Sequence, residues 1–203
     1  MMSGSLETDE EAARAQTYGL LSRLFYAPMD DALRRQLLAA APATPAGDGP
    51  VGAALAVLAE GARSADVGAL ADEYDALFGG VGKPEVMLYG SHYLSGFLND
   101  RPLAALRTDL GIWGLERAPA MSEPEDHLAY LCQVMRWLIV GDDPAIANLA
   151  NQQRFFARHL QPWVPALCAA IEGHPAARFY ALAGHFLGAF IAVETQAFDM
   201  FDE

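Results

Sequence analysis

The 203-residue sequence has few lysines and few cysteines, and each shortage excludes a class of function. Lys83 is the only lysine, and 26 acidic residues against 13 basic ones give a formal net charge of −13. A chain of this charge repels a phosphate backbone, so we expect no binding to nucleic acid. The two cysteines, Cys132 and Cys168, form no C-x-x-C pair and cannot make a disulfide framework. We expect both to be small buried side chains.

The sequence also lacks a recognisable targeting segment and a long uninterrupted apolar run. Residues 1–16 are acidic and contain no basic segment followed by an apolar one, which is unlike a signal peptide. The longest apolar stretch, 179–193, is interrupted by His185 and two glycines and is shorter than a bilayer span. We therefore expect a cytoplasmic protein with no membrane span, whose apolar residues, 53% of the chain, fill a core.

Amphipathic helical segments, by contrast, are abundant. Apolar residues recur at helical spacing, β-branched residues are scarce, and alternation with a period of two is absent. Glycine and proline interrupt the pattern near 41–50, 79–84 and 111–119. The pattern predicts an all-α protein, a bundle of roughly eight to ten helices in two lobes. The predicted parts are an N-terminal lobe over about 9–113, a hinge over about 114–123 and a C-terminal lobe over about 124–200.

Capping residues predict where several helices begin. Residues 8–11 and 122–125 have the spacing of a capping box, which predicts helices that begin at these positions. Asp30 and Ser91 are expected to be the N-caps of the helices that follow them.

Motifs for catalysis, metal binding and phosphate binding are incomplete. Residues 78–84 end in Gly-Lys like a Walker A loop, but Leu77 stands where the first glycine is needed and Pro84 replaces the magnesium-binding hydroxyl. The histidines lack metal-site spacing, and no cysteine lies near one in sequence. Residues 89–92 lack the second glycine of a hydrolase nucleophile elbow. We therefore expect no catalytic residue, no cofactor and no metal.

One segment stands out among the predicted helix starts. Residues 123–127, Glu-Pro-Glu-Asp-His, place three carboxylates and a histidine ahead of a predicted helix. The helix dipole favours the carboxylates but disfavours a cation, so we expect the imidazole of His127 to be neutral. Three interpretations stay open: a site for a cationic partner, a small cytoplasmic hydrolase or nucleotide-using enzyme with His127 as general base, or a capped helix in a structural protein.

The order of short motifs along the chain resembles the TorD/DmsD family over about residues 15–195. The matching motifs are Tyr74-Asp75-x-Leu77-Phe78, Met87-Leu88-Tyr89-x-Ser91-x-Tyr93, Pro102-Leu103-x-x-Leu106-Arg107, Glu123-Pro124-x-Asp126-His127-Leu128, Pro162-Trp163 and Phe179-Tyr180-x-Leu182-Ala183. Among them the Glu-Pro-x-Asp-His core is the most specific.

This resemblance implies a cytoplasmic, all-helical chaperone that is not an enzyme. Members of the family bind the twin-arginine signal peptide of a molybdopterin-containing oxidoreductase and hold the precursor for cofactor insertion before export. The implied partners are this peptide and the catalytic subunit that carries it. The resemblance also implies a monomer or a domain-swapped homodimer, and some members bind guanine nucleotide weakly.

The resemblance further implies which residues bind the peptide. Pro124, Asp126 and His127 match the family's site residues, and Tyr89 and Ser91 match positions between its motifs. Because a guanidinium group pairs bidentately with a carboxylate, Asp126 with Glu123 or Glu125 is expected to bind arginines. The aromatic side chains expected along the apolar part of the peptide are Trp113, Tyr89, Tyr93 and Trp137. The predicted peptide-binding set is Glu123, Pro124, Asp126, His127, Tyr89, Ser91 and Trp113.

Overall fold

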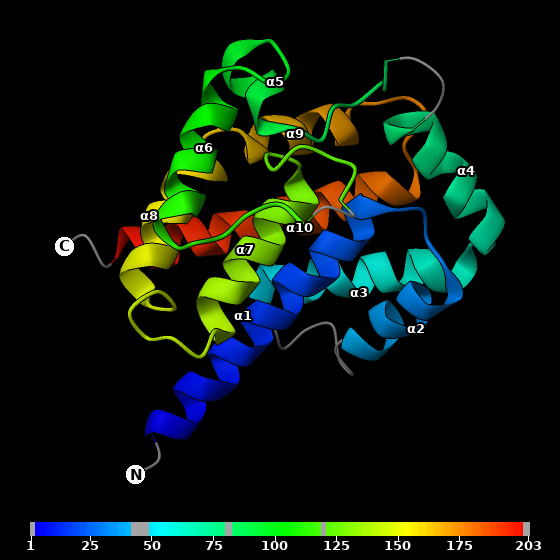
Figure 1. Cartoon of the computed structure of the whole chain (residues 1–203). Coiled ribbons are helices and arrows are strands. Elements are labelled where there is room, and N and C mark those ends of the chain that lie inside the picture. Colours follow the sequence, from blue (N-terminus) through cyan, green and yellow to red (C-terminus); the bar gives the residue numbers. More distant parts are fainter. Residues whose placement is uncertain (1–2, 42–48, 80–82, 119–120, 201–203) are drawn as a thin grey trace. The chain divides into compact units, whose positions relative to one another are not determined.

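The computed structural model describes residues 3–41, 49–79, 83–118 and 121–200, with the backbone alone for residues 3–8. Within these residues the chain forms ten helices and no strand, which confirms the all-α prediction (Figure 1). The helices are α1 (Ser3–Tyr26), α2 (Asp31–Ala40), α3 (Gly49–Ser64), α4 (Val67–Phe78), α5 (Gly90–Ser95), α6 (Arg101–Ile112), α7 (Leu128–Val140), α8 (Leu149–His159), α9 (Val164–Glu172) and α10 (Phe179–Asp199). The predictions for 41–50, 79–84 and 114–123 fall partly on residues 42–48, 80–82 and 119–120, outside the described residues.

The helices group into two compact units, each built from two separate stretches of chain. Unit 1 consists of Met1–Phe25 and Tyr89–Trp163, and unit 2 consists of Tyr26–Leu88 and Val164–Glu203. Unit 1 therefore holds nearly all of α1 together with α5 to α8, and unit 2 holds α2 to α4 with α9 and α10. This division differs from the two successive lobes predicted above, because the predicted hinge at 114–123 lies inside unit 1. Helical periodicity shows which face of a helix is apolar but not which other helix covers it.

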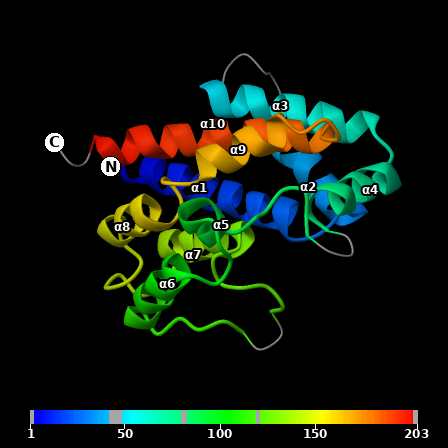
Figure 2. The same ribbon diagram turned by 90° about the horizontal axis from the view of Figure 1, so that it is seen from above.

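Unit 2 is built around α10, which packs along α3 and α9 (Figure 2). Gly184 allows a close approach to α9, since a Cβ there would lie 3.2 Å from the Ile171 side chain, whereas a Cβ at Gly188 would make an ordinary contact with Cys168 at 3.6 Å. The α10 helix has 21 residues and is long and apolar enough to cross a membrane by length and composition alone. The sequence-based expectation considered only the shorter stretch 179–193. The packing of α10 on α3 and α9 is typical of the core helix of a globular domain.

Unit 1 has α7 as its most buried helix. Leu128, Leu131, Met135 and Leu138 are each at most 1% exposed, and α7 packs against α8. The α1 helix is joined to this pair by a hydrogen bond from Arg14 to the Gln152 side chain, 3.2 Å long. A short α5 packs on α6 in the same unit.

Two of the predicted helix starts are wrong, and one is confirmed. The α1 helix begins at Ser3, so the capping box predicted at 8–11 lies inside the helix. The helix predicted from the capping box at 122–125 begins later, at Leu128. Asp30 caps α2 as predicted, since its Oδ1 accepts the Leu33 N–H at 2.6 Å.

Candidate functional site

Two short segments that are far apart in the sequence pair with each other in unit 1. Tyr89 and His127 form an isolated antiparallel bridge, and the Gly90 N–H donates to the Asp126 carbonyl at 3.0 Å. We call residues 89–91 together with 123–127 the motif cluster. It contains every residue of the predicted peptide-binding set except Trp113.

Asp126 holds the start of α5 rather than projecting into solvent. Its side chain is buried, at 4% exposure, and Oδ2 accepts the Ser91 backbone N–H at 2.8 Å. The prediction that Ser91 caps this helix is therefore wrong: α5 begins at Gly90, with Tyr89 in the N-cap position. The N–H groups at the start of a helix have no partner within the helix. Here the carboxylate that accepts one of them comes from 35 residues away in sequence.

Asp126 and Ser91 also line a small cavity, together with His159 and Trp163. Within the described residues, Asp126 Oδ1 and Ser91 Oγ have no hydrogen-bond partner, although both atoms are buried. Gly90 lies on the same wall, and a Cβ there would come within 3.1 Å of the Trp163 indole. Glycine at residue 90 therefore lets Trp163 pack closely against the motif cluster.

His127 is the N-cap of α7. Its Nδ1 accepts the Ala129 N–H at 3.2 Å, and its ring lies edge-on to the Tyr89 ring with centroids 5.2 Å apart. Burial lowers the pKa of His127 to about 4, although Glu123 and Asp126 favour the protonated form. The imidazole is therefore neutral near pH 7, as the sequence predicts. The α7 helix begins at Leu128, after the motif rather than within it.

The other carboxylates of the motif cluster differ in what they bind. Glu125 forms a two-pronged ion pair with Arg107, with distances of 3.0 and 2.8 Å, and this arginine holds the pKa of Glu125 below its usual value. Glu123 accepts the Tyr89 hydroxyl at 2.5 Å and is half-buried. The Pro124 carbonyl accepts the His127 N–H at 3.1 Å and closes the turn between them. Glu123 also accepts the Ser122 hydroxyl at 3.3 Å, so its carboxylate is bonded to two hydroxyl groups, whereas that of Glu125 is bonded to a cation.

The aromatic residues predicted along the peptide do not form one group. Trp113 follows α6, with its ring 5.9 Å from that of Phe155 in α8. Tyr93 stacks on Trp163 at 5.5 Å, and only Tyr89 belongs to the motif cluster. Trp137 lines a separate pocket.

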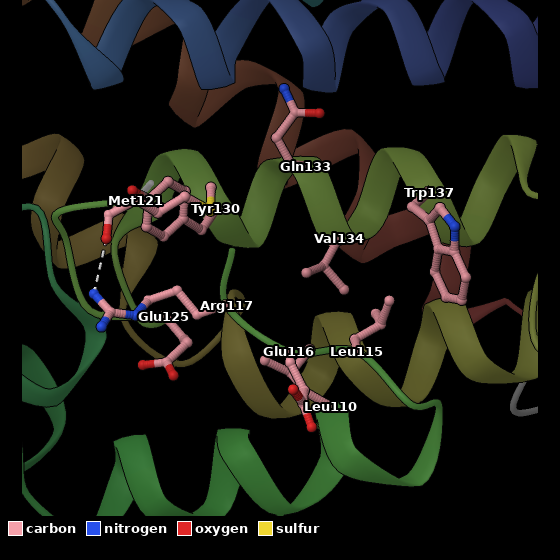
Figure 3. Close-up of a pocket in the computed structure, with 10 residues that line it drawn as sticks. All are labelled: Leu110, Leu115, Glu116, Arg117, Met121, Glu125, Tyr130, Gln133, Val134 and Trp137. Carbon is pink, nitrogen blue, oxygen red and sulfur yellow. Dashed lines mark hydrogen bonds between the residues drawn. The ribbon is translucent and has the colours of Figure 1, made fainter. Parts of the chain in front are cut away.

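That pocket is a feature that the sequence reasoning missed. It has a volume of about 190 Å³ and lies between the end of α6, the segment after it and the part of α7 from Tyr130 to Trp137 (Figure 3). We call it the α6–α7 pocket. Its lining is mostly apolar, and it includes Glu125 of the motif cluster.

A buried ionic network on α6 and α8 was missed as well. Asp109 Oδ2 lies 2.7 Å from His159 Nε2 and 2.7 Å from the Arg158 guanidinium, and Arg154 contacts the same carboxylate at 3.3 Å. Burial lowers the pKa of His159 despite the hydrogen bond to Asp109. No sequence pattern connects residue 109 to residue 159. In the part of the chain that the structure describes, no group of three or more His, Cys, Asp or Glu side chains is arranged to hold a metal ion.

Comparison with known proteins gives consistent matches. The family model described as nitrate reductase delta subunit matches residues 44–169, a range that includes the whole motif cluster. The chaperone protein TorD of Vibrio cholerae serotype O1 is 28% identical over 137 residues, which cover 64% of this chain and 62% of that protein. The chaperone protein TorD of Photobacterium profundum is 26% identical over 133 residues, covering 62% of each chain. The chain thus matches less than two thirds of the length of these curated relatives.

Among solved structures, a protein described as a redox enzyme maturation protein from Archaeoglobus fulgidus has a TM-score of 0.60 to this chain. The match covers 88% of this chain and 93% of that one, at 18% sequence identity. At this identity the likeness concerns the fold alone.

Proposed function

The chain belongs to the nitrate reductase delta subunit family, the TorD family that its motifs predict, and from this membership we propose that it is a chaperone for the maturation of a redox enzyme. It binds the twin-arginine signal peptide of a molybdopterin-containing oxidoreductase in the cytoplasm and holds the precursor until its cofactor is inserted. The observation that carries the proposal is that the family match includes the motif cluster, where residues 89–91 and 123–127 are joined by hydrogen bonds.

The geometry favours Glu123 as the carboxylate that receives an arginine of the peptide. Glu125 already binds Arg107, and Asp126 is buried with one oxygen on the Ser91 N–H. Glu123 is half-buried, and its bond to the Tyr89 hydroxyl fixes its orientation. A fixed, partly desolvated carboxylate binds a guanidinium group more strongly than a fully hydrated one. Asp126 and His127 then act as positioning residues that hold α5 and α7 around Glu123.

An enzymatic function with His127 as general base is less well supported. A pKa of about 4 is poorly matched to proton abstraction at neutral pH, and Nδ1 is engaged with the Ala129 N–H. The curated relatives are chaperones by name. Binding without turnover is the function that this site supports best.

The first test is peptide binding, measured by fluorescence anisotropy at low salt. The probe is a labelled synthetic peptide with two adjacent arginines followed by a leucine-rich segment, and its control has alanines in place of the arginines. We expect a Kd on the order of 1 μM for the first peptide and at least tenfold weaker binding of the second. Glu123→Gln weakens binding of the arginine peptide, whereas Glu85→Gln, an equal charge change in unit 2, leaves it unchanged. Equal affinity for both peptides would contradict the assignment.

The second test is a pull-down from the native cytoplasm with the wild-type chain as bait. Recovery of an oxidoreductase catalytic subunit with its leader still attached supports the chaperone function. Recovery of no protein, or of the bait alone, supports a purely structural helical protein instead.

A further inference from the structure

The α6–α7 pocket supports an inference that rests on the proposed function and extends it to the apolar part of the peptide. Three helical or loop segments of unit 1 supply its apolar walls. The apolar lining residues are Leu110, Leu115, Met121, Tyr130, Val134 and Trp137. No residue of this set except Trp137 was expected to contact a peptide.

The pocket begins at the motif cluster. Glu125 belongs to both, and the Tyr130 ring at the pocket wall lies 5.8 Å from the His127 ring. Figure 3 shows Tyr130, Met121 and Glu125 together at one end of the pocket and Trp137 at the other. A ligand held at Glu123 therefore has an apolar surface next to it, on the same unit.

The charge at the rim that is open to a cationic occupant is that of Glu116, which is exposed. The other acid of the lining, Glu125, is already paired with Arg107. The one arginine of the lining, Arg117, donates to the Met121 carbonyl at 2.9 Å, so its guanidinium is partly engaged by backbone. The chain as a whole carries a net charge of −13.

The size of the pocket favours side chains over a whole small molecule. Its volume of about 190 Å³ is below the roughly 300–1,000 Å³ of typical small-molecule sites. Grooves that bind amphipathic helices accept a few apolar anchor residues spaced one helical turn apart. We propose that the α6–α7 pocket binds aliphatic side chains of the peptide's apolar segment while the adjacent arginine is bound at Glu123.

A charge placed in the pocket tests this proposal. Val134→Glu puts a carboxylate on the half-buried wall of the pocket, and Val140→Glu puts the same group at an exposed position of α7 outside it. With the arginine and leucine peptide described above, we expect Val134→Glu to weaken binding at least tenfold and Val140→Glu to change it less than twofold. Equal affinities of the two variants overturn the pocket assignment.

A second peptide separates the pocket from the arginine site. In this peptide serines replace the leucines and the two arginines are kept. We expect the wild type to bind the serine peptide more weakly than the leucine peptide. We expect Val134→Glu to bind the serine peptide as the wild type does, because the serine peptide lacks the leucines that interact with residue 134. If Val134→Glu weakens both peptides equally, the pocket does not contact the leucines and the proposal is wrong.

Tryptophan fluorescence gives a readout that does not depend on the Val134→Glu protein being well folded. Burial of Trp137 by the leucine peptide shifts the emission to shorter wavelength in the wild type. The shift is lost in Trp137→Phe, and a shift that persists in Trp137→Phe overturns the proposal. If the wild type binds neither peptide, the proposed function itself fails; if it binds both and the variants behave alike, only the pocket assignment fails.

Discussion

Unit 1 contains two buried settings of aspartate and histidine that use the same side chains in opposite ways. Asp109 and His159 lie 50 residues apart in sequence and contact each other at 2.7 Å, with two half-exposed arginines on the same carboxylate. Asp126 and His127 are adjacent in sequence, yet one binds the Ser91 N–H and the other the Ala129 N–H.

The difference shows that an Asp-His dipeptide in a motif is not an Asp–His pair in the structure. The carboxylate of Asp109 is neutralised by cations, which is typical of a network that stabilises a fold. Asp126 has an uncharged backbone partner and one buried oxygen without a partner in the described residues. Asp126 holds the start of α5 and His127 holds the start of α7. The four predictions that follow test how far the two settings differ.

The largest effect is expected for Asp109→Ala. The substitution removes the acceptor of His159, Arg158 and Arg154 together. Leaving the buried His159 ring without its partner costs up to about 3 kcal/mol, and the contacts of the two half-exposed arginines are lost as well. Urea unfolding followed by circular dichroism measures the change in free energy of unfolding. Asp109→Asn, which keeps one acceptor oxygen, should lose less. A loss below about 1 kcal/mol for the alanine variant would contradict this prediction. It would show that water satisfies the groups that Asp109 binds in the wild type.

The second prediction concerns pH and His127. Its pKa is about 4 in the folded protein against about 6.5 in the unfolded chain, so the unfolded state binds more protons between these values. Stability therefore rises with pH from about 4 to 6.5 and levels off above, by up to about 3 kcal/mol. Burial lowers the pKa of His159 in the same direction.

His127→Asn separates the two histidines, because asparagine can cap α7 and does not titrate. Urea unfolding between pH 4.5 and 7.5 should give a smaller slope for this variant than for the wild type, with the His159 part remaining. Superimposable curves would show that His127 is not the buried neutral histidine.

A smaller loss is expected for Asp126→Ala. It leaves the Ser91 N–H without its acceptor, which costs about 1–2 kcal/mol, whereas Asp126→Asn keeps an oxygen in place and is nearly neutral. Because Asp126 positions the motif cluster, Asp126→Asn should also bind the arginine peptide within twofold of the wild type. Tenfold weaker binding with unchanged stability would instead place the Asp126 carboxylate in direct contact with the peptide.

The smallest effect is expected for Arg107→Ala. The Arg107 side chain is 55% exposed and that of Glu125 is 15% exposed, so the pair should contribute no more than about 1 kcal/mol. The loss should shrink further when unfolding is repeated in high salt. A loss as large as that of Asp109→Ala would mean that the pair behaves as a buried one.

Much of the fold and part of the site could be predicted from sequence, because these depend on local signals. Helical periodicity gave the all-α class, and Asp30 at its helix start was enough to identify a cap. The neutral state of His127 was expected from its place before a helix, whereas in the structure burial is what lowers its pKa. The helix starts near residues 8 and 122 were wrong because a matching pair of side chains does not by itself begin a helix. Arg107 binds the Glu125 carboxylate that the second capping box needed.

The sequence alone therefore determined the class of fold, the approximate helices and the motifs that place the chain in its family. Tertiary structure alone decided that unit 1 joins residues 1–25 to 89–163, that Asp126 caps α5, and that an apolar pocket lies beside Glu125. The physical reason is one of range. Helix formation depends on neighbours a turn apart, whereas the partner of a buried carboxylate is whichever donor the folded chain brings within 3 Å of it.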